Sequence, residues 1–225
     1  MTSAIIIAAG KSTRMGGTDK LFLEVNGCPI VGYTWRTFDA CNDINEIILV
    51  IREQAREAFE VLAEKLGLKK PFQFVAGGKE RQDSVWNGLA ALSPASEIVA
   101  IQDAARPCTT GELIGATIRA ARSTGAAVAA QPVTDTIKES HNGETIERTL
   151  DRSQLWAVQT PQTFRVEIIR RALAEVRKKG LLVTDDTAAC ELIGQPVRLI
   201  VSSVPNPKIT RPEDLCYLEA LLKNE

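Results

Sequence analysis

Histidine is almost absent from this sequence. Of the 225 residues only His141 is a histidine, and it precedes Asn142-Gly143, a pair typical of a turn. A Ser-His-Asp triad, an H-E-x-x-H metal site or a histidine proton relay would each have to use this one residue. Because a histidine at the tip of a turn is usually solvated, we expect chemistry that depends on lysine, arginine, backbone amides and carboxylate-bound metal.

Membrane-spanning runs and paired cysteines are also lacking. No apolar run reaches transmembrane length, and the start of the chain has no secretory pattern. The five cysteines are scattered and odd in number, without C-x-x-C spacing, which favours reduced thiols over a disulfide framework or a metal site. A net charge of −1 provides no basic excess for nucleic acid. We therefore expect a cytoplasmic protein with no membrane or nucleic-acid partner.

Short apolar segments alternate with amphipathic segments of helical length. The expected strands begin near Ala4, Glu46, Phe72, Ile98 and Ala126, and helices are expected over 30–40, 53–66, up to about 92, 111–123, 166–179, up to 193, and 215–223. With 44% hydrophobic residues, the chain can bury one sizeable core. The pattern predicts an α/β fold: a single doubly wound, Rossmann-like domain over 1–225 with a mainly parallel sheet.

Three polar loops follow the strands, over 10–20, 77–84 and 103–107. In a doubly wound sheet, ligands bind beyond the carboxyl ends of the strands, where these loops are expected to meet. The first loop combines glycines and small residues with several cations, which suits a polyphosphate.

Neither familiar phosphate motif fits this first loop. Gly10-Lys11-Ser12 matches the end of a P-loop, but Ile5 stands where its first glycine should be. Ser12 also stands where a dinucleotide fingerprint needs its second glycine. The alternative to a phosphate site is an ordinary strand-to-helix turn with solvated charges.

The alternation of strands and helices breaks after residue 132. Two polar, extended segments over 134–139 and 145–150 predict a hairpin whose Asn142-Gly143 pair favours a type I′ turn. A polar two-stranded arm is only marginally stable alone, so we expect this arm, at about 134–155, to pack on a partner subunit. The alternative is a solvated excursion.

Near the end of the chain, Thr210 and Glu213 have the spacing of a capping box before the last helix. Lys208 is therefore expected just before a helix start, at the ligand edge of the sheet.

The polar residues expected at this edge suit nucleotidyl transfer. Asp103 stands at a strand end, where a divalent metal that bridges phosphates can be held. The cations are Arg14, Lys20, Arg106, Arg152 and Lys208. A phosphate oxygen of an acceptor is already ionised at neutral pH, so the reaction needs alignment and charge stabilisation but no general base.

Eight motifs, in order along the chain, resemble the 2-C-methyl-D-erythritol 4-phosphate cytidylyltransferase family of the non-mevalonate isoprenoid pathway. They are Ala8-Ala9-Gly10 with Arg14-Met15-Gly16; Lys20; Gly77-Gly78 with Arg81 and Asp83-Ser84-Val85; Asp103-Ala104-Ala105-Arg106-Pro107; Asp135-Thr136-Ile137-Lys138; Asp151-Arg152; Gln159-Thr160-Pro161-Gln162 with Thr184-Asp185; and Lys208 to Asp214. Together they span nearly the whole chain.

The resemblance implies a cytidylyltransferase that joins CTP to a small polyol phosphate, methylerythritol 4-phosphate, with release of pyrophosphate and a requirement for Mg²⁺ or another divalent cation. It implies that Arg14 and Lys20 stabilise the transition state, and that Arg152 and Lys208 are also catalytic. Residues implied to hold the nucleotide are Ala8, Ala9, Gly10, Gly78, Ser84 and Ala104. Residues implied to bind the acceptor are Asp103, Arg106, Thr136, Arg152, Thr160 and Lys208, and Asp103 is also the candidate metal ligand.

The resemblance further implies a homodimer in which the hairpin arm carries Thr136 and Arg152 into the partner's site. Asp19, Gln102 and Pro207 stand where the family commonly has proline, histidine and an apolar residue. Lys11 has no counterpart among the motifs.

Two alternatives remain open. Ribitol 5-phosphate cytidylyltransferases share most of these motifs, although they tend to carry Ser-Val where this chain has Ala104-Ala105. A nucleotide-binding regulatory module without turnover would be expected to have lost a charged catalytic residue, and none of the five cations or Asp103 is missing.

Overall fold

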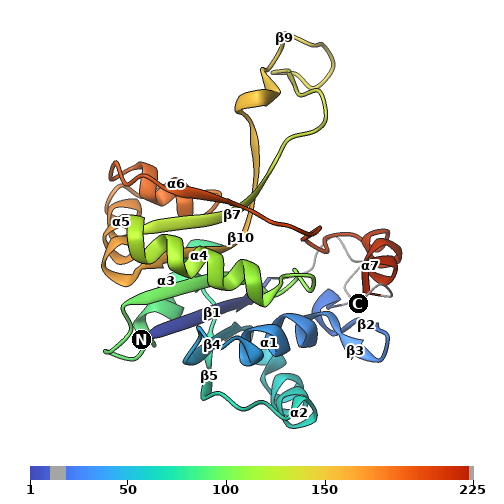
Figure 1. Ribbon diagram of the computed structural model, residues 1–225, viewed down its shortest axis with the longest axis vertical. Helices are drawn as coiled ribbons and strands as arrows, with labels where there is room; N and C mark the ends of the chain where they lie inside the picture. Colours follow the sequence, from blue (N-terminus) through green and yellow to red (C-terminus); the bar gives the residue numbers. More distant parts are fainter. Residues whose placement is uncertain (11–18, 223–225) are drawn as a thin grey trace.

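A computed structural model describes residues 1–10 and 19–222, and its centre is a seven-stranded sheet (Figure 1). The strand order is β11-β7-β10-β6-β1-β4-β5. The strands are β1 (Thr2–Ala8), β4 (Glu46–Ile51), β5 (Phe72–Ala76), β6 (Ile98–Asp103), β7 (Ala126–Pro132), β10 (Trp156–Arg165) and β11 (Arg198–Val201). The strands expected from the sequence are all present, and the α/β fold with a mainly parallel sheet is confirmed.

One strand of this sheet runs against the others. β10 pairs antiparallel with both β6 and β7, whereas the remaining pairs are parallel. The sequence did not identify it as a strand, because Pro161 interrupts the pattern and polar side chains such as Thr160 and Gln162 are buried along it. The pairing of β10 with β7 shifts register between Val158 and Gln162, around that proline. This irregular stretch lies beside the end of β6, where it contributes side chains to the candidate site.

Helices cover both faces of the sheet and bury its alternating side chains (Figure 1). The helices are α1 (Ile30–Ala40), α2 (Arg56–Leu66), α3 (Arg81–Ala90), α4 (Gly111–Thr124), α5 (Val166–Lys178), α6 (Asp186–Glu191) and α7 (Asp214–Leu222). Ile6 of β1 packs in one core with α1, α2 and α4, whereas its neighbour Ile5 packs in the other core with α3, α5 and α6. In the described part of the chain no helix is long and apolar enough to cross a membrane.

The segment after β1 departs from the sequence expectation. The apolar residues of 21–25 suggest a short extended segment, but Lys20–Phe22 forms one turn of 3-10 helix before the short hairpin of β2 (Glu24–Val25) and β3 (Cys28–Pro29). Asp19 caps this turn, because its Oδ1 accepts a hydrogen bond from the Leu21 amide at 3.2 Å.

The hairpin arm projects away from the sheet, beyond the ends of β7 and β10 (Figure 1). Its paired part is short, with only β8 (Lys138–Glu139) facing β9 (Arg148–Thr149). The predicted type I′ turn is wrong, because Gly143 has a positive φ of 73° but Asn142 does not. The Asn142 side chain instead accepts hydrogen bonds from the amides of Glu144 and Thr145, at 2.9 and 3.0 Å, within a longer tip loop.

The turn that leads into α7 is capped by a different carboxylate from the one expected. The predicted pairing of Thr210 with Glu213 is wrong: Asp214 Oδ2 accepts hydrogen bonds from the amides of Thr210 and Arg211, at 2.6 and 2.9 Å. Burial acts to raise the pKa of Asp214, but these hydrogen bonds and Arg211 hold it below the ordinary value. The cap fixes the chain immediately after Lys208.

We expect Asp214→Ala to lower the free energy of unfolding by about 1 kcal/mol, the usual cost of losing a helix cap. Because the folded pKa is depressed, this stabilisation is present above the unfolded value of about 3.9 and lost as pH falls through the lower folded value. Urea unfolding at pH 7 measures the effect, with Glu213→Ala as the matched control. Equal losses in the two variants would contradict the cap assignment.

Candidate active site

The carboxyl end of β1 and its neighbours forms a surface of small residues and backbone amides. Ala8 ends β1, and Ala9 lies so close to Gly77 that a Cβ at Gly77 would stand 2.3 Å from the Ala9 Cβ. The Gly78 amide donates a hydrogen bond to Ser84 Oγ at 3.0 Å, which ties the glycine pair to α3. Ala9, directly after β1, therefore lies beside the 77–84 loop, and their shared surface suits a phosphate or a nucleotide.

Ala104 is fixed at the same edge, directly after β6. Its amide donates to the Ile7 carbonyl at 3.1 Å, and its own carbonyl accepts a hydrogen bond from Thr34 Oγ1 at 3.0 Å. The side chain is buried, so the residues implied to hold the nucleotide, as far as the structure describes them, share one edge of the sheet.

A buried carboxylate surrounded by cations lies next to this surface. Asp103, the last residue of β6, has its Oδ2 at 2.8 Å from Lys208 Nζ and 3.7 Å from Arg106 Nε. Its Oδ1 lies 3.5 Å from Arg81 Nε. We call these four residues, Asp103, Arg81, Arg106 and Lys208, the Asp103 cluster. Three cations therefore converge on one buried carboxylate.

Lys208 reaches Asp103 because Asn206, two residues earlier, is held in the core. Asn206, 1% exposed, donates through Nδ2 to the Thr160 carbonyl at 2.9 Å and accepts at its own carbonyl from Arg106 Nη1 at 2.6 Å. After Lys208, the Ile209 amide donates to the Ala105 carbonyl at 2.8 Å. Pro207 stands between these anchors, and the lysine keeps its contact with Asp103.

Lys20 joins the same region through the backbone. Its Nζ donates a hydrogen bond to the carbonyl of Ile209 at 2.7 Å, one residue beyond Lys208. The two lysines predicted to be catalytic are far apart in the sequence, but Lys20 is hydrogen-bonded to the residue that follows Lys208.

The irregular stretch of β10 closes the site on its third side. The Asp103 amide donates to Thr160 Oγ1 at 3.1 Å, so these two residues, both predicted to bind the acceptor, lie side by side. A cavity of about 150 Å³ lies here, lined by Arg81, Asp103, Arg106, Val158, Gln159, Thr160, Gln162, Thr184, Asp185 and Lys208.

Arg81 and Asp186 belong to the site, but no role for them was predicted from the sequence. Arg81 begins α3, and its Nη1 lies 2.9 Å from Asp186 Oδ2, at the start of α6. Gln162 links β10 to the start of α6, because its Oε1 accepts from the Asp186 amide at 3.0 Å and its Nε2 donates to Asp185 Oδ2 at 2.8 Å. The feature of the sequence that could have indicated a role for Arg81 is its position at the start of a helix, shortly after the Gly77-Gly78 pair.

The pKa values of the two carboxylates next to Arg81, Asp103 and Asp186, are shifted in opposite directions. Burial acts to raise the pKa of Asp103, but Lys208, Arg81 and Arg106 together hold it below its ordinary value. Burial raises the pKa of Asp186, and Arg81 only partly offsets that effect. Asp103 is therefore firmly ionised, whereas ionised Asp186 is less favourable than in water.

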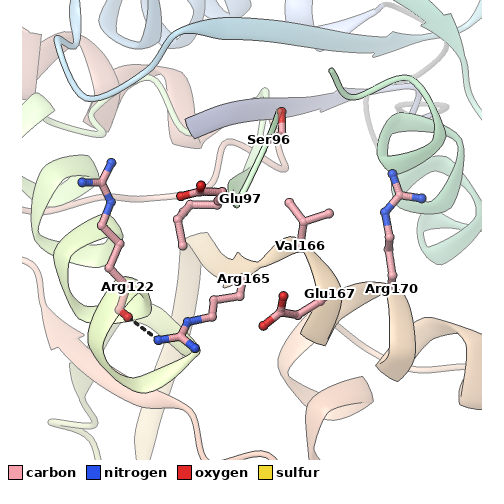
Figure 2. A pocket seen from close by; sticks show the side chains of 8 residues that line it. Ser96, Glu97, Arg122, Arg165, Val166, Glu167 and Arg170 are labelled. Atoms are coloured by element: carbon pink, nitrogen blue, oxygen red, sulfur yellow. Dashed lines mark hydrogen bonds between the residues drawn. The ribbon is translucent and has the colours of Figure 1, made fainter. Parts of the chain in front are cut away.

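A larger cavity of about 710 Å³ lies at the opposite edge of the sheet, near the start of β6 (Figure 2). Three arginines line it, but their guanidinium groups point apart, and Glu97 and Glu167 stand among them (Figure 2). Arg165 Nη2 is already bonded to the Arg122 carbonyl at 2.6 Å. The larger volume therefore lacks the converging charge of the Asp103 cluster.

Not every predicted residue is brought to this edge. Thr136 and Arg152 lie on the projecting arm, both exposed, and Arg152 Nη1 donates to the Thr134 carbonyl at 2.5 Å. Arg14 lies outside the described residues, as does Lys11.

A resident metal ion does not fit the protein groups at this edge. Among residues 1–10 and 19–222 there is no group of three or more histidine, cysteine or carboxylate side chains placed to hold one. Both oxygens of Asp103 already face cations. The predicted metal role of Asp103 therefore stays a prediction that depends on phosphate oxygens as further ligands.

Comparisons with known proteins agree with this geometry. The sequence profile of the 2-C-methyl-D-erythritol 4-phosphate cytidylyltransferase family matches residues 2–224. The enzyme of that name from Pelotomaculum thermopropionicum is 42% identical over 98% of this chain and 94% of its own, and that from Geobacillus thermodenitrificans is 44% identical over 97% and 96%.

Solved structures show the same likeness. The 4-diphosphocytidyl-2C-methyl-D-erythritol synthase of Anaerococcus prevotii superposes with a TM-score of 0.89 at 32% identity, covering 99% of this chain and 96% of that one. The 2-C-methyl-D-erythritol 4-phosphate cytidylyltransferase of Thermus thermophilus does so with a TM-score of 0.79 at 33% identity, covering 99% and 100%.

We expect Asp103→Asn to lower the free energy of unfolding at pH 7 by about 3–5 kcal/mol, because it leaves buried cations unpaired. Asp186→Asn should cost less, about 1–2 kcal/mol, because burial already disfavours its charge. Denaturant unfolding of both variants measures the difference.

The free energy of unfolding should also depend on pH through Asp103. Its folded pKa is depressed, so its stabilisation is present above about 3.9, the unfolded value, and is lost as pH falls through the lower folded value. The gap between wild type and Asp103→Asn should therefore narrow below that pH. A larger loss for Asp186→Asn than for Asp103→Asn would contradict the charge assignment.

Proposed function

The chain belongs to the 2-C-methyl-D-erythritol 4-phosphate cytidylyltransferase family, and from that premise we propose that it joins CTP to 2-C-methyl-D-erythritol 4-phosphate. The products are 4-diphosphocytidyl-2-C-methyl-D-erythritol and pyrophosphate. The observation that carries this proposal is the Asp103 cluster, in which three cations converge on one buried carboxylate beside a small cavity and the 77–84 loop. An acceptor phosphate and a triphosphate fit these two halves.

The acceptor phosphate is proposed to bind between Lys208 and Arg106. Both cations already have their charge directed at Asp103, so a phosphate can use them without a costly rearrangement. Thr160 stands next to Asp103 and offers a hydroxyl for the same ligand. Asp103 then keeps the two cations apart and oriented, and its oxygens are available to accept from a hydroxyl of the acceptor.

The chemical step needs no base from the protein. An ionised oxygen of the acceptor phosphate attacks the α-phosphorus of CTP, a new P–O bond forms, and the bond from the α-phosphorus to the bridging oxygen breaks. Its electron pair leaves with pyrophosphate. Lys20 is proposed to stabilise the charge on the α-phosphate, from a position fixed by its hydrogen bond to Ile209. Arg14 is proposed to do the same from the loop that follows Gly10.

Divalent metal is proposed to be required, because it neutralises the triphosphate, and to be held mainly by phosphate oxygens. The chain's own contribution is the arrangement of cations around Asp103.

We also propose that the active form is a homodimer. The supporting observations are that the arm projects from the body (Figure 1) and that Thr136 and Arg152, which the family resemblance places in an acceptor site, are exposed on it. A second copy that receives this arm would gain Arg152 as a fourth cation next to its own Asp103 cluster.

Pyrophosphate release from CTP tests the proposed reaction. We expect rapid release with methylerythritol 4-phosphate, far slower release with ribitol 5-phosphate, and none without an acceptor. UTP and GTP in place of CTP are the nucleotide controls. A preference for ribitol 5-phosphate would transfer the assignment to the related ribitol enzymes, and CTP binding without turnover on any acceptor would favour a regulatory module.

Lys20→Ala and Arg14→Ala should each lower kcat by about two to three orders of magnitude, the scale of losing one preorganised donor to a developing charge. Steady-state kinetics measures this, with Lys11→Ala as the control in the same loop. A loss smaller than about threefold would remove the residue in question from the mechanism.

Mixing two inactive variants tests the shared site. Lys20→Ala and Arg152→Ala homodimers should both be nearly inactive, but a mixed dimer has one site with all residues intact. Random exchange of subunits should therefore restore about a quarter of wild-type activity, because half the dimers are mixed and each has one working site. No recovery after exchange, confirmed by native mass spectrometry, would contradict a site shared between subunits.

A further inference from the structure

The ion pair between Asp19 and Arg52 lies outside the roles assigned above. We propose that these two residues position Lys20 for the transfer step and keep the Asp19 carboxylate from repelling the triphosphate. The proposal deepens the proposed function, because it concerns the same site, and it rests on the role of Lys20 there.

The chain after Lys20 is anchored in the core. Leu21 is 3% exposed, and the ring of Phe22 packs edge-on against Phe59 with a centroid distance of 4.9 Å. These contacts fix the carboxyl side of the 3-10 turn. They do not fix its amino side, where the chain enters from the preceding loop.

Asp19 fixes that amino side through both its backbone and its side chain. Its backbone carbonyl accepts from the Phe22 amide at 3.0 Å, and its Oδ1 accepts from the Leu21 amide at 3.2 Å. Its Oδ2 forms an ion pair and hydrogen bond with Arg52 Nη2. Lys20 is therefore held between a capped, ion-paired residue and two residues packed in the core.

Arg52 brings this anchor from a rigid part of the sheet. It directly follows Ile51, the last residue of β4, which is in register with Ala8 of β1 and Ala76 of β5. The Ile51 carbonyl also accepts from the Gly77 amide at 2.8 Å. The guanidinium therefore extends from the point where β1 and β5 also end, and it ties the Lys20 turn to this edge of the sheet.

The charges give the pair a second effect. A carboxylate next to Lys20 would repel a bound triphosphate and would compete with it for the lysine. Arg52 neutralises that carboxylate, while Lys20 Nζ is directed to the Ile209 carbonyl. Loss of Arg52 therefore has two separable consequences: a less precisely placed Lys20, which lowers kcat, and an Asp19 carboxylate without the Arg52 charge beside it, which raises KM for CTP.

The next ion pair along the chain provides a matched control. Glu53 and Arg56 form a surface pair with Nε to Oε1 at 2.6 Å, one residue beyond Arg52, and within the described part of the chain no hydrogen bond or ion pair joins this pair directly to the Asp103 cluster. An exposed pair of this kind contributes little to stability, so Glu53→Gln should leave kcat and KM unchanged.

The experiment compares kinetics of Arg52→Gln, Asp19→Asn, the double variant and Glu53→Gln. We expect Arg52→Gln to lower kcat about tenfold, because a small misplacement of a catalytic group is costly. KM for CTP should rise about threefold to fivefold, the scale of one half-exposed charge contact. In the double variant, KM should return to within about twofold of wild type while kcat stays low, since the repelling carboxylate is gone but the anchor is still missing.

Combination with Lys20→Ala separates positioning from general damage. If Arg52 acts through Lys20, then adding Arg52→Gln to Lys20→Ala should lower kcat by less than about twofold. Arg52→Lys, which keeps the charge, should retain most of the wild-type kcat. Thermal unfolding midpoints of Arg52→Gln and Glu53→Gln within a few degrees of wild type, about 2–4 °C, confirm intact folding.

Two results would overturn the proposal: Arg52→Gln kinetics equal to those of Glu53→Gln, or the same tenfold loss of kcat with and without Lys20. Failure of the proposed function is distinguishable from either. In that case the wild-type protein would bind CTP, measured by calorimetry, but release no pyrophosphate with methylerythritol 4-phosphate.

Discussion

The site depends on one carboxylate that the sheet buries among cations. Asp103 ends the central strand β6, and Lys208, Arg81 and Arg106 approach it from a late loop, from α3 and from its own loop. Taking these charges out of water is expensive, and their attraction offsets the cost only if each partner is held in place. The surrounding hydrogen bonds, from Asn206 to Thr160 and from Arg106 to Asn206, hold them there.

This constraint connects parts of the chain that are distant in sequence. Lys20 is hydrogen-bonded to Ile209, and Ile209 is hydrogen-bonded to Ala105. One backbone segment therefore joins the proposed triphosphate subsite at Lys20 to the proposed acceptor subsite at Asp103. Arg106 and Lys208 are the cations that we propose an incoming acceptor phosphate to use. A preorganised cluster of this kind stabilises developing charge without reorganisation during the reaction. That property explains how the enzyme manages without a histidine in the site.

The sequence predicted most of the fold because its strands are apolar and its helices amphipathic. Elements such as Ile30–Ala40 and Glu46–Ile51 have the expected bounds. It failed for β10, where Pro161 and buried polar side chains hide the strand, because that polarity serves the site rather than the sheet. It also failed at the arm tip and at the cap of α7, where side-chain hydrogen bonds of Asn142 and Asp214 replace the expected motifs.

For the site itself, the family motifs predicted Asp103, Arg106, Thr160 and Lys208, which the structure brings together. They did not predict roles for Arg81, Asp186 or Arg52, because an ion pair between distant segments leaves no local pattern. The most direct test of the account is a crystal structure with methylerythritol 4-phosphate and a non-hydrolysable CTP analogue. We predict the acceptor phosphate between Lys208 and Arg106, with the α-phosphate near Lys20. An acceptor phosphate bound away from the Asp103 cluster would contradict the account.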